Sequence, residues 1–95
     1  MRTLLVEDDF TSRKILHKLL SQYGECEIAV NGEEAIEAFK MALEEAKPYS
    51  LICMDIMMPI TDGQQALQRI REIERERNLN FDQEVKAIMI TALSD

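Results

Sequence analysis

Four oxygen-bearing side chains stand at the ends of apolar segments, where polar residues are conspicuous. Asp8 and Asp9 follow the run Thr3–Val6, Asp55 closes a second apolar run, and Thr91 follows a third. In open parallel α/β sheets, ligands bind beyond the carboxyl ends of the strands. If the three runs are neighbouring parallel strands, these four residues converge on one edge of the sheet.

Three carboxylates gathered in one place repel one another, so a cation is expected to offset their charge. Oxygen ligands with room for water suit a hard divalent cation, and Mg²⁺ is the ion we expect. A carboxylate can also be a covalent acceptor of a phosphoryl group, which makes Asp55 a candidate acceptor. The hydroxyl of Thr91 could hold another phosphoryl oxygen.

The elements that would position these residues follow from the spacing of apolar side chains. Short apolar or alternating runs predict strands, and helical spacing between them predicts amphipathic helices. We expect the third helix to be capped by Asp62, with Gln65 three residues later. Strands are predicted at 3–6, 26–30, 51–56 and 87–90, with helices at 11–22, 31–47 and 62–77. This βαβαβαβ order predicts an α/β fold with a parallel sheet covered by helices on both faces.

Three segments of the chain resemble receiver domains of two-component response regulators, including those of chemotaxis. They are Leu5–Phe10, Met54–Gly63 and Ile88–Ala92, and the pattern Asp-x-x-Met-Pro-x-x-Asp-Gly in the second is the most specific. The resemblance extends along residues 1–95, taken as a single domain. It implies a flavodoxin-like three-layer fold with sheet order 2-1-3-4-5.

The resemblance also implies roles for individual residues. Asp55 would be the phosphoacceptor, supplied by a sensor histidine kinase or a phosphotransfer protein. Asp9 would bind Mg²⁺ directly, Asp8 through water, and Met57 through its backbone carbonyl. Thr91 would contact the phosphoryl group and move on activation. Such a module assists its own phosphorylation but is not an enzyme.

One departure from the family concerns the C-terminus. Receivers continue with a fourth helix, a fifth strand ending in a lysine, and a fifth helix, whereas this sequence ends at Asp95. Lys86 lies at the wrong end of its strand to replace that lysine. We therefore expect sheet order 2-1-3-4, weakened phosphorylation, and self-association through the exposed edge of strand 87–90.

The composition argues against some classes of binding partner. The formal net charge of −7 and pI near 4.7 argue against binding of nucleic acid or anionic membranes by this segment. Cys26 and Cys53 lie in apolar runs and are interpreted as buried thiols, which fits a reducing cytoplasm. No membrane-spanning run is expected.

Other interpretations are weaker. An aspartate-nucleophile phosphatase usually needs a second acid two residues after the nucleophile, where this chain has Met57. A non-signalling receiver-like interaction module, or an inactive truncated fragment, stays open. We interpret His17 as a solvated surface histidine, and the charged residues of the third helix, Glu74 among them, as a solvated face.

Overall fold

The computed structural model describes residues 1–55 and 60–90. Strands and helices alternate along the chain, as the apolar spacing predicts, with two short 3₁₀ helices in the connections. In order, the elements are β1 (Arg2–Val6), α1 (Phe10–Leu20), η1 (Ser21–Tyr23), β2 (Glu25–Ala29), α2 (Gly32–Glu44), β3 (Leu51–Asp55), α3 (Ile60–Glu76), η2 (Phe81–Gln83) and β4 (Lys86–Ile90).

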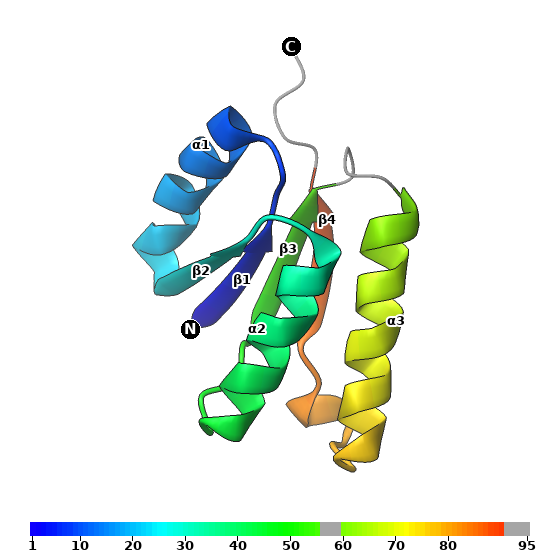
Figure 1. The fold of residues 1–95 in the computed structure, drawn as a ribbon. Coiled ribbons are helices and arrows are strands. Elements are labelled where there is room, and N and C mark those ends of the chain that lie inside the picture. Colours follow the sequence, from blue (N-terminus) through cyan, green and yellow to red (C-terminus); the bar gives the residue numbers. More distant parts are fainter. Residues whose placement is uncertain (56–59, 91–95) are drawn as a thin grey trace.

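The strands form one parallel sheet of order β2-β1-β3-β4 (Figure 1). This confirms the predicted α/β fold with a parallel sheet and its predicted order 2-1-3-4. A crossover after each of β1, β2 and β3 returns the chain to the same end of the sheet, so the carboxyl ends of the four described strands share one edge. Within the described residues, β2 and β4 are the outermost strands.

α2 and α3 cover one face of the sheet, and a continuous apolar core fills the space between them and the strands (Figure 1). Leu4 and Val6 of β1 and Ile52 and Met54 of β3 point to this face, since side chains alternate along a strand. The helices contribute Ala35, Phe39, Ala42, Ala66, Ile70 and Ile73, all buried.

Among the elements that the structure describes, α1 is the helix that packs on the other face, and none of its residues is fully buried. Leu5, Cys26 and Cys53 form a smaller buried cluster there, with Leu16 and Leu20 of α1 packed against it. Both cysteines are free and buried, as predicted.

Helix starts follow the capping signals only in part. The Asn31 side chain accepts a hydrogen bond from Glu34 N at 2.8 Å, which confirms the predicted start of α2. The predicted cap at Asp62 is wrong, because α3 begins at Ile60 and places Asp62 in its first turn. Aspartate is favoured both at the cap and in the first turn of helices in general, so residue preference alone did not distinguish the two positions.

Two residues that were interpreted as solvated, Glu74 and His17, form hydrogen bonds within the protein. Glu74 is only 1% exposed, and its carboxylate accepts hydrogen bonds from Val85 N and from Arg71 Nη1, each at 2.7 Å. His17 is half-buried, and its Nε2–H donates to the Cys26 carbonyl at 2.9 Å. Both interpretations are wrong because each side chain contacts a backbone group of a segment outside its own helix, Val85 before β4 and Cys26 in β2, and helical spacing does not reveal such contacts.

Candidate functional site

Asp55 is the last residue of β3 and its carboxylate is buried, with only 3% of the residue exposed. Side chains on β3 alternate, so Asp55 lies on the same face of the sheet as Cys53, the face that α1 covers. In open parallel α/β sheets, ligands bind beyond the carboxyl ends of the strands, which is where this carboxylate lies. Its position therefore indicates a functional role.

Glu7 stands beside it, and the sequence pattern did not identify this residue. Its backbone N–H donates to the Ala29 carbonyl at 3.0 Å, so the β1–β2 pairing continues one residue beyond β1. β1 and β3 are paired with Leu5 opposite Cys53. Two residues further along each strand, the same face carries Glu7 and Asp55. Strand alternation together with this register was the signal that could have found Glu7.

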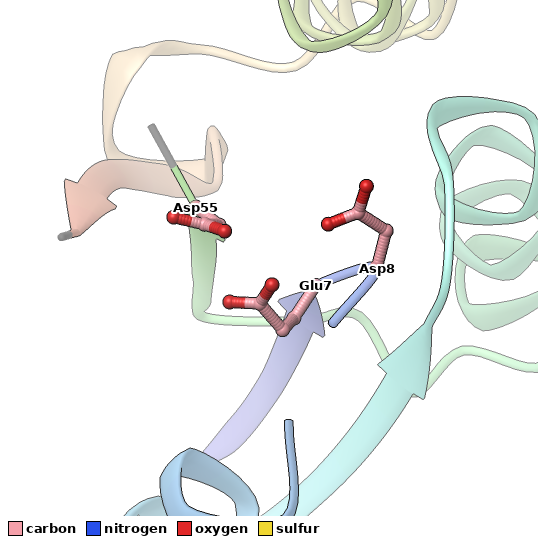
Figure 2. A group of neighbouring side chains, drawn as sticks. All are labelled: Glu7, Asp8 and Asp55. Carbon is pink, nitrogen blue, oxygen red and sulfur yellow. The ribbon is translucent and has the colours of Figure 1, made fainter. Parts of the chain in front are cut away.

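The carboxylates of Glu7, Asp8 and Asp55 face one another at the sheet edge (Figure 2). One oxygen from each lies within 4.8 Å of the others. Glu7 is fully buried and Asp8 is exposed, so the group opens to solvent on the side of Asp8. This geometry could hold a metal ion while leaving room for water or a phosphoryl oxygen.

The pKa of Glu7 is raised to about 7, because burial penalises its charged form. Its contact with the Asp55 carboxyl and the negative charges of Asp55 and Asp8 act in the same direction. The Asp9 N–H, which donates to Glu7 Oε2 at 3.1 Å, acts in the opposite direction. Glu7 Oε1 is buried and has no hydrogen-bond partner among the described residues. A hard divalent cation would satisfy that oxygen and offset the crowded charge, so the residues fit Mg²⁺.

Asp9, the predicted direct metal ligand, caps α1 instead of joining this group. Its Oδ2 accepts from Ser12 N at 2.8 Å, and its pKa is lowered mainly by hydrogen bonds from Ser12. Its role as a ligand stays a prediction. Met57 and Thr91 lie outside the described residues. Lys86 begins β4, at the opposite end of the sheet, where its Nζ donates to the Phe81 carbonyl at 3.4 Å.

Comparison with known proteins identifies the family. The profile of the response regulator receiver domain matches residues 3–95. The chain therefore belongs to the receiver domain family of two-component and phosphorelay signalling.

Individual relatives agree with this assignment. The chain is 40% identical over 84 residues to probable histidine kinase 2 of Oryza sativa subsp. indica, covering 78% of this chain and 8% of that protein. It is 44% identical over 75 residues to hybrid signal transduction histidine kinase B of Dictyostelium discoideum, covering 78% of this chain and 4% of that protein. The chain thus spans only a small part of these curated relatives.

A solved structure with the same fold is the receiver domain of the response regulator Ssk1 in complex with the phosphotransfer protein Ypd1, from Saccharomyces cerevisiae. The TM-score is 0.72 and the identity 27%, over 100% of this chain and 66% of that chain. Within the described residues, no helix is long and apolar enough to cross a membrane.

Proposed function

We propose that this protein is a phosphorelay receiver that accepts a phosphoryl group on Asp55 from a phosphohistidine donor and thereby switches its interactions with partners or outputs. The observation that carries the proposal is the burial of the Asp55 carboxylate at the end of β3, beside Glu7 and Asp8. In a receiver domain, this is the edge of the sheet where a ligand binds.

The transfer itself needs few groups. An Asp55 carboxylate oxygen attacks phosphorus and forms an O–P bond, while the P–N bond to the donor histidine breaks and the imidazole leaves. The product is an acyl phosphate on Asp55. Mg²⁺, when bound, offsets the charge of the carboxylates and of the phosphoryl oxygens. The protein supplies position and charge, so it takes part in its own phosphorylation without being an enzyme.

Asp55, Asp8 and Glu7 are the described residues that would hold the ion, because one oxygen of each lies within 4.8 Å of the others. Asp9 is the alternative ligand to Glu7 that the sequence predicts. The Met57 carbonyl and the Thr91 hydroxyl complete the site in this proposal, as metal ligand and as phosphoryl contact.

The donor in this proposal is a sensor histidine kinase or a phosphotransfer protein. Two findings support it: curated relatives named as histidine kinases, and a similar receiver solved with the phosphotransfer protein Ypd1. The two free, buried thiols fit a reducing, cytoplasmic setting.

Phosphodonor labelling tests the acceptor. Acetyl phosphate with Mg²⁺ should add one phosphoryl group to the wild-type chain, seen by intact-protein mass spectrometry, and none to Asp55→Asn. Labelling should also stop when EDTA removes the metal. An unlabelled wild-type chain would instead favour the non-signalling interaction module or the inactive fragment, and labelling of Asp55→Asn would place the acceptor elsewhere.

Mg²⁺ titration separates the two candidate ligands beside Asp8. Glu7→Gln should weaken Mg²⁺ binding more than Asp9→Asn does, because the Glu7 oxygen lies in the carboxylate group and the Asp9 oxygen is bonded to Ser12 N. The reverse order would restore Asp9 as the direct ligand. Asp55→Asn is the positive control for loss of a ligand.

A second part of the proposal is self-association through the edge of β4. Ile88 and Met89 are 44% and 54% exposed, on the outermost strand of the described sheet. Such an edge can pair with a strand of another copy. Light scattering should show a concentration-dependent dimer that Met89→Lys weakens, and a compact monomer at high concentration would contradict it.

A further inference from the structure

Arg13 lies in the first turns of α1, and its guanidinium turns back toward the acidic loop that precedes the helix. Its Nη1 donates to the Glu7 carbonyl at 3.4 Å, and the guanidinium carbon lies 5.5 Å from the centre of the Phe10 ring. The residue is half-buried, whereas its neighbour Lys14 is exposed. We propose that Arg13 is a positioning residue that holds the peptide between Glu7 and Asp8 in the orientation that binds the metal. This inference rests on the proposed function.

Arg13 contacts a backbone atom, the Glu7 carbonyl oxygen, whose orientation affects where the Asp8 side chain lies. The Glu7 carbonyl belongs to the peptide unit that joins Glu7 to Asp8, and one rotation of that unit would change the direction of the loop that carries the Asp8 side chain. On the other side, Glu7 N–H is already held by the Ala29 carbonyl at 3.0 Å. The sheet therefore holds the N–H of Glu7, and Arg13 holds its carbonyl.

The far end of the loop is held by the helix start. Arg13 N–H donates to the Asp9 carbonyl at 2.9 Å, and Asp9 Oδ2 accepts from Ser12 N. Backbone and side chain of Arg13 thus contact both ends of the segment from Glu7 to Asp9. Groups that orient metal ligands without touching the metal commonly control affinity through such hydrogen bonds.

Removal of the Arg13 side chain should change Mg²⁺ affinity in opposite directions, depending on whether its charge or its positioning contact matters more. The inference can therefore be tested. Removing a positive charge near an anionic site should strengthen Mg²⁺ binding slightly, because the repulsion between the two cations is lost. Removing a positioning contact should weaken Mg²⁺ binding, because the carboxylates are less well ordered. The direction of the change therefore separates the two effects.

The experiment is a calorimetric Mg²⁺ titration of the full chain, comparing the wild type with Arg13→Ala, Arg13→Lys and Lys14→Ala. Lys14→Ala is the matched control, since it removes the same charge from an exposed position on the same helix. Thermal melting without Mg²⁺ reports any loss of stability separately from affinity.

We expect Arg13→Ala to bind Mg²⁺ about 10-fold more weakly than the wild type, at the lower end of the range for such supporting residues. Lys14→Ala should bind as well as the wild type or slightly better, and Arg13→Lys should recover part of the loss. If Arg13→Ala and Lys14→Ala have equal affinities, or if Arg13→Ala lowers only the metal-free melting temperature, the inference is overturned.

Where Arg13→Ala does not fold, the comparison of Arg13→Lys with the wild type decides, since this variant keeps the charge and loses the guanidinium geometry. Equal affinities there would overturn the inference. A wild-type chain that binds no Mg²⁺ would overturn the proposed metal site first, and phosphodonor labelling of Asp55 would then show how much of the proposed function survives.

Discussion

The two faces of the sheet are built differently. The face under α2 and α3 has a continuous core in which Phe39 is 2% exposed and Ile70 is fully buried. The face under α1 has three buried residues in its cluster, and no residue of α1 itself is buried. Burial of apolar surface is the main source of stability, so most of it should come from the α2–α3 face.

The carboxylates of Glu7 and Asp55 lie at the carboxyl edge of the face that α1 covers. Asp55 follows Cys53 by two residues, and Glu7 follows Leu5 by two, so both carboxylates share that face with the α1 cluster. The strands that carry them are anchored from the opposite face. The comparison shows that β1 and β3, which carry the carboxylates, are packed mainly from the face opposite the carboxylates.

The largest expected effect concerns Phe39 of α2. Phe39→Ala should lower the free energy of unfolding by about 3–5 kcal/mol, because it leaves a cavity in the main core. Leu16→Ala, on half-buried α1, should cost only about 1–2 kcal/mol. Urea unfolding followed by circular dichroism measures both. Equal losses would mean that the two faces contribute alike.

A smaller loss of folding stability is expected when Glu74 is replaced. Glu74→Ala should destabilise the fold by about 1–3 kcal/mol, because it leaves the buried Val85 N–H without its acceptor. Glu72→Ala on the same helix is the control, since Glu72 is exposed. The same urea measurement applies, and matching values for the two variants would contradict the buried role of Glu74.

On the α1 face, His17 should contribute about 1 kcal/mol through its hydrogen bond to the Cys26 carbonyl. His17→Ala should speed amide exchange in α1 and β2 and leave α2 and α3 unchanged, as measured by hydrogen–deuterium exchange. Lys18→Ala, at an exposed neighbouring position, serves as the control. Faster exchange in α2 as well would mean that the two faces open together.

The smallest expected difference between the two faces concerns the rate at which Cys26 and Cys53 are alkylated. Burial raises the pKa of Cys26 to about 11, so little reactive thiolate forms at neutral pH, and Cys53 is more deeply buried. We expect slow alkylation of both thiols, through opening of the α1 face rather than global unfolding. The labelling rate should then depend less on urea than global unfolding does. Equal urea dependence would contradict a separately opening face.

Much of this could be predicted from sequence because it depends on local pattern. Apolar alternation and helical spacing located the four strands and three α-helices of the described residues and indicated a parallel sheet. The family resemblance implied the order of the strands. Asp55 and Asp8 were predicted to belong to the site, and both lie in the carboxylate group. Each stands where an apolar run ends, which is visible in the chain itself.

The remaining features depend on neighbours that are distant in sequence. Glu7 joins the site because the β1–β3 register sets it beside Asp55. Glu74 is buried because Val85, eleven residues later, returns to donate to it.

The sequence by itself determined the elements, the sheet and the presence of an acidic edge, because strand and helix periods are properties of consecutive residues. Only the tertiary structure decided which carboxylates meet, since strand register and side-chain contacts depend on how separate elements pack together.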